Sequence, residues 1–489
     1  MKKIIKYIVV VIVLLSAASC ELERENYTEI YPDNFYKNET DIILAVNDLY
    51  SPFITYWGNL YCANYSGYPT FSELTTDAYW SNYGGSYDDV RLHKWAGAST
   101  AYEMTLLETM FRNYNFISKA RNVVRHIEQS SVSPLIKDKY IGEANALRGW
   151  MGLILYDMFG PVPVASDEVL DNPATFVYLP RLTEEEYREF MESTLIDAIN
   201  KLPVNQSVRG RVTKGFAQMV LAKYCMIRKD FVNAEKLCRD IISLENSVYE
   251  LLPDYFDVFK YENQGNKEVI HAILTDRAYR PNYWHAHVVP DDYPIPSGIT
   301  VYAGMLIPWD FIDTFEENDE RLKGILTSYK DKNGNMVNRG YGKLVRGAYP
   351  ALKYSFDPNQ QGEGSSNDYV VFRYADVLLM LAECINENAG PTAEAVALVN
   401  RIRSRAGLSD LSSAQTSAKD VLNSTILLER GHELYAEGFR RQDLIRRGKY
   451  IEEALKIPGS LSAPYKVRFP IPRSIIQESK DMVKQNDGY

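Results

Sequence analysis

Residues 136–160 read IKDKYIGEANALRGWMGLILYDMFG, and this stretch decides the fold class. Its apolar residues recur at the spacing that puts them on one face of an α-helix. A similar run occupies 106–129, with Ser133-Pro134 between the two runs and Gly160-Pro161 after the second. Proline and glycine at such places mark helix ends. The pattern therefore predicts two long amphipathic helices in succession.

Further helical runs follow this stretch along the chain. Thr183 and Glu186 form a capping-box pair at the start of a run that ends at Pro203. A helix pair is predicted over 211–244, with a break near residues 228–230. Four more runs follow, at 374–390, 392–407, 420–438 and 439–455. Such pairs predict a mostly α fold on a tetratricopeptide-repeat-like scaffold, with irregular loops and small β-hairpin elements.

The middle of the chain, 246–370, has a different pattern. Residues 324–341 alternate around Asn333-Gly334, which is a strong signal for a β-hairpin. Asp331 suggests a calcium loop, but Met336 and Gly342 occupy the positions that such a loop needs for glycine and glutamate. Residues 359–368 form a polar connector rich in glycine and serine. We expect hairpins and loops here, with no calcium site.

The N-terminus has the three parts of a secretory signal. Three lysines within the first six residues precede an apolar run at 7–15 and then small residues. That run is too short to cross a bilayer, which takes roughly 20 helical residues. Cys20 follows as in the lipobox of bacterial lipoproteins, although Ala17 replaces the usual leucine. We expect a signal peptide over 1–19 and lipidation of Cys20; the alternative is an ordinary cleavage site with a chance cysteine.

Charge and cysteine content exclude several classes of protein. The net charge is −10, which gives no electrostatic basis for binding nucleic acid. The four cysteines beyond Cys20 contain no CxxC pair, so a zinc site is not expected. One disulfide is compatible with export, but the spacing leaves its pairing open among Cys62, Cys225, Cys238 and Cys384. No motif indicates a cofactor.

Nine segments in order resemble the SusD/RagB family of outer-membrane nutrient-binding lipoproteins. They include DNFYKNETDIILAVNDLY (33–50), EANALRGWMGLILYDMFGPVPV (143–164), FRYADVLLMLAECINENAG (372–390) and ERGHELYAEGFRRQDLIRRGK (429–449). The glycines of LRGWMGLILYDMFG depart mildly from the family pattern. The resemblance implies N-terminal, middle and C-terminal regions over 20–245, 246–370 and 371–489.

The resemblance also implies a function. A protein of this family is anchored by lipid to the outer membrane, facing the cell exterior. There it lies as a lid over a SusC-like TonB-dependent transporter and captures oligosaccharide, without catalysis. Peptides or another nutrient are the alternative ligands. A glycan-degrading enzyme is less favoured, because no motif places two carboxylates around a cleft.

Candidate ligand residues are aromatic side chains interleaved with polar ones, because sugars need flat apolar faces and directional hydrogen bonds. The first set lies in the loop-like segment 71–97 and the second in 277–296. The expected contacts are Asp77, Trp80, Asn82, Tyr83, Trp95, Tyr283, Trp284 and Tyr293. For each aromatic residue, the alternative is that its ring packs the loop onto the scaffold.

Two other clusters are interpreted as structural. His285 and His287 are expected to be polar neighbours in an aromatic loop, with no metal between them. The charge-dense segment 429–447 is expected to form a structural ion network, with helical i,i+4 pairs Glu437–Arg441 and Asp443–Arg447. Trp150 lies in an apolar helical run and is expected in the core.

Overall fold

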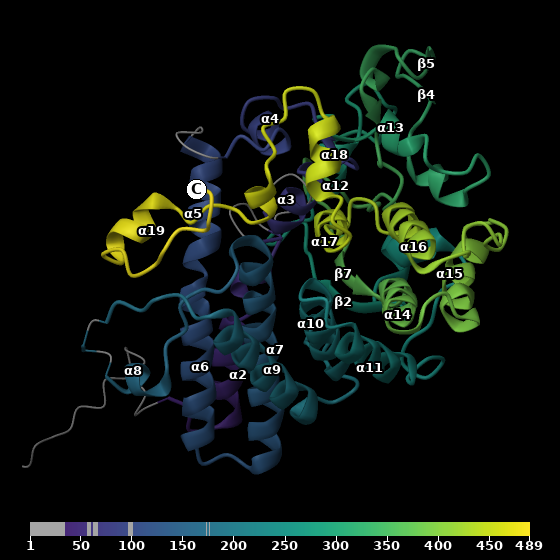
Figure 1. Cartoon of the computed structure of the whole chain (residues 1–489). Coiled ribbons are helices and arrows are strands. Elements are labelled where there is room, and N and C mark those ends of the chain that lie inside the picture. The colour runs from purple at the N-terminus through teal and green to yellow at the C-terminus, as the bar shows by residue number, and fades with distance from the viewer. Residues whose placement is uncertain (1–34, 56–59, 62–66, 96–100, 173, 176) are drawn as a thin grey trace, which may run out of the picture.

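The computed structural model describes residues 35–55, 60–61, 67–95, 101–172, 174–175 and 177–489 (Figure 1). Cys20, Cys62 and the expected signal peptide lie outside the described residues. Within them the chain is mostly helical, as predicted. No helix in these ranges is both long and apolar enough to cross a membrane.

The predicted central helix is α7 (Pro134–Phe159), which ends at Gly160 with φ 78°. The run predicted before it is two helices, α5 (Ala101–Arg112) and α6 (Tyr114–Gln129), separated at Asn113. Figure 1 shows α6, α7 and α9 (Glu184–Lys201) side by side, and α7 packs on both neighbours. Trp150 of α7 is 1% exposed, which confirms its place in the core.

The next helices continue the series of packed neighbours. The predicted capping box is present at the start of α9, where Thr183 and Glu186 each satisfy the other's backbone N–H. The predicted break separates α10 (Lys214–Ile227) from α11 (Phe231–Ile242). Shorter helices flank this scaffold: α2 (Glu39–Asp48), α3 (Tyr68–Leu74), α4 (Ser86–Arg91) and α8 (Asp167–Asp171).

After α11 the chain leaves the helical series and rejoins it at α14 (Tyr374–Ala389), which packs on α11. The strands β2 (Val269–Ile273) and β7 (Tyr369–Arg373) pair antiparallel where the chain departs and returns. Beyond α14 come α15 (Ala393–Arg405), α16 (Lys419–Glu433), α17 (Arg440–Arg446), α18 (Tyr450–Lys456) and α19 (Arg473–Glu478). The predicted helices over 420–438 and 439–455 are therefore shorter, and the second is split.

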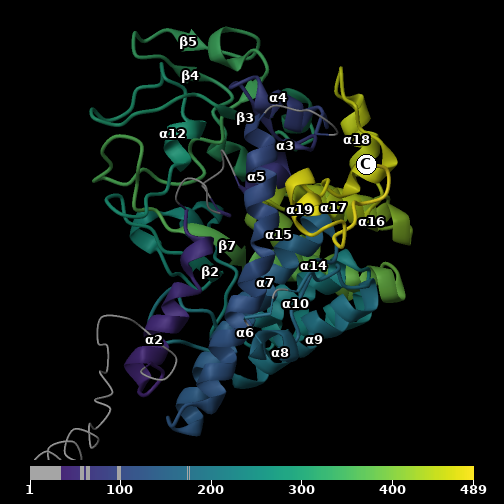
Figure 2. The same cartoon turned by 90° about the vertical axis from the view of Figure 1, so that its left-hand side faces the viewer.

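The excursion between β2 and β7 has its own apolar cluster around Trp284, Met305 and Tyr349. Its short elements are α12 (Trp284–Val288), α13 (Trp309–Ile312), β3 (Met305–Pro308), β4 (Tyr329–Lys330), β5 (Met336–Val337) and β6 (Gly347–Ala348). The predicted hairpin is confirmed, because β4 pairs with β5 around Gly334. Figure 2 shows β3, β4 and β5 with α3 and α4 at the upper end of the molecule.

The charge-dense segment 429–447 forms a buried ion network, as predicted, but between different partners. Glu437 pairs with Lys353 and Arg373, and Arg441 pairs with Asp157. Arg447 likewise pairs with α14 carboxylates rather than with Asp443. The predicted i,i+4 pairs are wrong. For Glu437–Arg441, the turn between α16 and α17 interrupts the helix. Asp443 pairs instead with Arg430 of α16 and with Arg446 of its own helix.

Candidate functional site

A three-stranded sheet brings the two predicted ligand segments together. The strand β1 (Trp80–Ser81) pairs antiparallel with β3, and β3 pairs with β6. Beyond β1, the Asn82 amide donates to the carbonyl of Gly304 at 2.7 Å. Gly304 and Tyr302 in turn donate to carbonyls of α12 at 2.9 and 2.7 Å. These backbone bonds fix the 80–87 segment against α12 and the chain that enters β3.

The outcome is a group of rings that we call the aromatic cluster: Tyr83, Tyr87, His287 and Tyr302. Tyr83 meets His287 edge-on at 5.8 Å between ring centroids, and Tyr302 lies 5.6 Å from His287. Tyr87 lies 5.2 Å from Tyr83. Tyr83 is 37% exposed and Tyr302 44% exposed, whereas His287 is 6% exposed. The two tyrosines thus present ring surface to solvent over a buried histidine.

Hydrogen bonds hold these rings in place. The Tyr83 hydroxyl and His287 Nδ1 share one hydrogen bond, and the Tyr302 hydroxyl donates to the Glu363 carboxylate. Burial lowers the pKa of His287 to about 3, so the imidazole is neutral at ordinary pH. Burial also raises the pKa of Tyr83, and the nearby Tyr302 and Glu363 add to this effect. The cluster therefore carries neutral rings beside one exposed carboxylate.

Trp80 and Asn82 lie next to the cluster, the Trp80 ring in contact with guanidinium groups and the Asn82 amide hydrogen-bonded, while the Trp80 indole N–H is buried without a partner among the described residues. The guanidinium carbon of Arg91 is 3.7 Å from the Trp80 ring centroid, and that of Arg346 is 5.2 Å away. A sugar would therefore meet a ring already in contact with a guanidinium. The Asn82 side chain donates to the Ala303 carbonyl at 3.2 Å and to the Tyr349 hydroxyl at 3.0 Å.

Two predicted contacts are corrected by the structure. Trp95 is 2% exposed and Trp284 is 1% exposed, so neither offers a face to a ligand. Trp95 packs against Phe469 at 4.8 Å and donates its indole N–H to the Tyr489 hydroxyl at 2.7 Å. Trp284 belongs to the apolar cluster of the excursion. Both rings pack the chain, which is the alternative that the sequence left open.

The remaining predicted residues divide by burial. Asp77 forms a bidentate ion pair with Arg440 at 2.7 and 2.9 Å, which is a structural contact between α17 and the chain after α3. Tyr283 and Tyr293 are half-buried, and Tyr293 meets Tyr329 edge-on at 5.6 Å. The segment 71–97 is only partly loop, because it contains most of α3, β1 and α4.

Sequence reasoning missed two members of the site, Tyr302 and Glu363. Tyr302 lies between Gly298 and Gly304, in a stretch without helical spacing. An aromatic residue in such a loop-like, glycine-containing stretch is the signal that selected Tyr83. Glu363 lies in the polar connector 359–368, but only the folded chain places it against Tyr302. His287 was interpreted as a polar neighbour, and its contact with both tyrosines is consistent with that role.

The arrangement suits an uncharged polar ligand that has one apolar face. Exposed tyrosine rings contact the C–H face of a sugar at low entropic cost. Glu363 can accept hydrogen bonds from hydroxyl groups, and the exposed Arg346 can donate to them. Aromatic rings with a few directional polar groups are the usual components of a ligand site.

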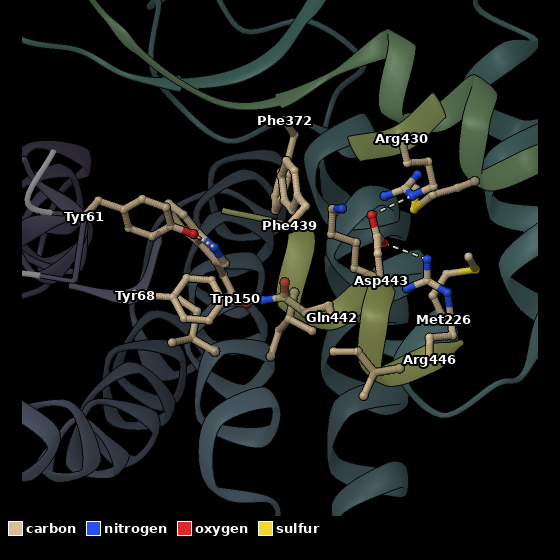
Figure 3. A pocket seen from close by; sticks show the side chains of 15 residues that line it. Tyr61, Tyr68, Trp150, Met226, Phe372, Arg430, Phe439, Gln442, Asp443 and Arg446 are labelled. Atoms are coloured by element: carbon tan, nitrogen blue, oxygen red, sulfur yellow. Dashed lines mark hydrogen bonds and ion pairs between the residues drawn. The ribbon is translucent and has the colours of Figure 1, made fainter. Parts of the chain in front are cut away.

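Another hollow lies inside the helical core, where Trp150, Tyr68 and Gln442 face the ion pairs of Asp443 (Figure 3). Its volume of about 30 Å³ admits a water molecule but no sugar ring. Gln442 donates to Tyr68, Ser72 and Asp157 there, while its Oε1 is buried without a partner among the described residues. This hollow suits a structural water and is not a ligand site.

The fold and the cluster together define a class: a helical-pair scaffold with an excursion from the helices, where exposed Tyr302 of the excursion lies near exposed Tyr83 of the 80–87 segment. Comparison with known proteins agrees with the fold. The model of the SusD family matches residues 307–489. SusD-like protein P25 of Formosa agariphila is 25% identical over 100% of both chains. The starch-binding protein SusD of Bacteroides thetaiotaomicron is 30% identical over 53% of this chain and 56% of its own.

A solved structure shows the same fold. Surface glycan-binding protein A from Bacteroides thetaiotaomicron, in complex with laminarihexaose, superposes with a TM-score of 0.73 at 20% identity. The match covers 91% of this chain and 99% of that one. These matches confirm the predicted resemblance to the SusD/RagB family.

Proposed function

We propose that this protein binds glycans at the aromatic cluster without chemically altering them. The observation that carries the proposal is the pair of exposed tyrosines, Tyr83 and Tyr302, held beside Glu363. Two similar proteins support it by name, one as starch-binding and one through its complex with laminarihexaose. Trp80 and Asn82 are proposed to border the ligand.

The proposal extends to where the protein acts. The N-terminal sequence supports a lipid anchor at Cys20. The proposed place in the outer membrane, with the folded chain facing the exterior, rests on the resemblance to the SusD/RagB family. We propose that the bound glycan is delivered to a SusC-like TonB-dependent transporter. Co-purification of the full-length protein with a barrel partner from its native membrane tests this step, and repeated recovery without such a partner contradicts it.

Calorimetric titration tests the ligand. The purified protein is titrated with laminarin, starch and other neutral polysaccharides, and compared with a Tyr83→Ala, Tyr302→Ala double variant. Loss of binding in the variant supports the site. The matched control is Tyr341→Ala, because Tyr341 is 74% exposed and lies on the β5 side of the hairpin, outside the cluster. Equal binding by the double variant contradicts the site.

Two outcomes redirect the function. If no glycan binds to the folded protein, peptides become the next ligands to test on the same site. Release of reducing sugar from a bound glycan contradicts the non-catalytic part of the proposal. Glycosidases place two carboxylates roughly 5–9 Å apart around the bond that they cleave, and Glu363 is the carboxylate that contacts the cluster.

A further inference from the structure

A second hollow of about 400 Å³ opens between α2, the turn before α10, and β2. In Figure 2 the α2 and β2 ribbons lie below α12, on the side away from the C-terminal helices. Ligand pockets for small molecules commonly measure 300–1,000 Å³. This groove thus has room for one or two sugar rings, and it is distinct from the aromatic cluster.

The lining of the groove is basic, in contrast to the acidic chain as a whole. Among the described residues that line it are three arginines, Arg209, Arg211 and Arg280, and no aspartate or glutamate. The chain as a whole carries more acidic than basic residues, 64 against 54. A basic pocket in an acidic protein attracts anions selectively, because the surrounding surface repels them.

The three arginines are not equivalent. Arg211 donates to Glu143 and to Asn47, both at 2.7 Å, and Arg209 pairs with Asp368. Arg280 is exposed, and its guanidinium has no partner among the described residues. The first two are held by carboxylates behind the groove wall, so Arg280 brings the uncompensated positive charge.

The turn that carries two of these arginines is fixed against the opposite wall. Gly210, at φ 85°, lies between Arg209 and Arg211, and a Cβ there would be 2.7 Å from the Leu274 side chain. Only glycine permits this backbone angle together with so close an approach. The arginine-bearing turn and the segment from β2 to Arg280 therefore form one rigid rim.

The inner wall offers a buried polar group. His271 of β2 lines the groove and is 5% exposed, and its imidazole ring has no hydrogen-bond partner among the described residues, while its backbone belongs to the β2–β7 pairing. Its ring packs 4.6 Å from Phe216 and 5.5 Å from Trp150. Burial lowers the pKa of His271 to about 3, so the ring is neutral and offers one N–H donor. Since no protein group takes this N–H, the imidazole can donate it to a ligand in the groove.

We infer that this groove binds a carboxylate-bearing saccharide, such as a uronic acid residue. The carboxylate meets the guanidinium of Arg280, whose planar donors match its two oxygens. The ring enters between Ile54 and Leu274, and a hydroxyl or carboxylate oxygen accepts from His271. The inference goes beyond the proposed function and does not depend on the aromatic cluster.

Titration of the full-length protein with glucuronate, glucose and inorganic sulfate tests the inference. We expect saturable binding of glucuronate that weakens with salt, and at least tenfold weaker binding of glucose and of sulfate. Arg280→Gln is expected to raise the Kd for glucuronate roughly tenfold, since it removes a charge-assisted hydrogen bond. His271→Phe keeps the ring packing and is expected to weaken binding as well.

Two control variants separate this site from the rest of the molecule. Arg473→Gln makes the same charge change at an exposed arginine at the start of α19, and its Kd should equal that of the wild type. The Tyr83→Ala, Tyr302→Ala variant should also retain glucuronate binding. The inference is overturned if Arg280→Gln binds glucuronate like the wild type, if glucose or sulfate binds equally well, or if the tyrosine variant loses binding.

Discussion

Tyr83 and Trp95 lie twelve positions apart in one predicted ligand segment, and the fold gives them opposite roles. Trp95 is sealed by Phe469 and by Tyr489, the last residue of the chain. Tyr83 stays 37% exposed, because its ring neighbours Tyr87 and His287 cover only part of it. Burial of Trp95 thus depends on partners more than 370 positions away in the sequence.

This contrast gives a first prediction. Trp95→Ala should lower the free energy of unfolding by about 3–5 kcal/mol, because it removes a large, fully packed ring. Tyr83→Ala should change it by less than about 1 kcal/mol and act on glycan binding instead. Urea unfolding and calorimetric titration of both variants measure the two effects. Equal destabilisation by the two substitutions would contradict the assignment of roles.

Such contacts limit what the sequence could predict about the site. Residue chemistry and loop composition were enough to select Tyr83, Trp80 and Asn82, which lie in or beside the cluster. They could not separate Trp95 and Trp284 from these residues, because burial of a ring is decided by distant segments. Tyr302 and Glu363 were missed for the same reason.

Glu73 is a buried carboxylate at the end of α3, close to the site in sequence. Its Oε1 accepts from the amides of Gly438 and Phe439 at 2.7 and 3.0 Å, while Oε2 is buried without a partner among the described residues. Burial raises the pKa of Glu73 to about 7, although these backbone donors oppose the shift. The folded state therefore favours the protonated acid.

The direction of the pH effect follows from this raised pKa. The contribution of protonated Glu73 to the free energy of unfolding is fully present below pH 4.5 and is lost as the pH rises through about 7. Glu73→Gln should match the wild type in unfolding free energy at pH 4.5 and exceed it by up to about 3 kcal/mol at pH 8. Urea unfolding at the two pH values measures this. Parallel pH profiles of the two proteins would contradict the raised pKa.

At the scale of elements, α7 and α9 approach closely because α7 carries glycine at the contact. A Cβ on Gly149 would lie 2.4 Å from Leu195 Cδ2, and one on Gly152 would lie 2.5 Å from Met191 Sδ. The bulky residues of α9 fill the space that the glycines leave.

The effect of Gly149→Ala on stability should change sign when Leu195 is also replaced by alanine. Gly149→Ala should destabilise the protein by about 1–3 kcal/mol through overpacking against Leu195. In a Leu195→Ala background the same change should stabilise by about 0.5–1 kcal/mol, since alanine is the better helix former. Thermal or urea unfolding of the wild type, the two single variants and the double variant gives the coupling free energy between residues 149 and 195. Additive effects would contradict the direct contact.

Most elements of the scaffold were predictable from the sequence because helical spacing is a local property. The existence of α7, α9, α10 and α14 followed from periodicity and capping, and the hairpin from Asn333-Gly334. The ends of α16 and α17 were predicted wrongly. The charged residues around the break have helical spacing in the sequence, but in the structure they lie in separate elements. These charged residues pair with residues of α14 and of the excursion, and such tertiary contacts cannot be seen in helical spacing.

At the scale of the whole molecule, a buried ion network joins segments far apart in the chain. Arg373 is fully buried and pairs with Glu268 at 3.0 Å, with Glu437 at 2.8 Å, and with Glu433. Removing one member of a buried network leaves the others as uncompensated charges. The network therefore ties β7, the start of β2 and the end of α16 together.

This gives the last prediction. Arg373→Met should lower the unfolding free energy by about 3–5 kcal/mol. The control Arg239→Met breaks exposed pairs with Glu235 and Glu394 and should cost less than about 1 kcal/mol. Urea unfolding of both variants compares them directly. A similar small loss for both would show that the buried network contributes little.

The return of α14 to pack on α11 has a consequence for how this scaffold can diversify. The chain between β2 and β7 contributes most of the exposed aromatic surface, while the helical stack closes behind it as a continuous unit. Insertions or exchanges within the excursion can alter what is recognised and leave the stack's own contacts in place. Selection can thus act on one part of the gene while the architecture is inherited unchanged.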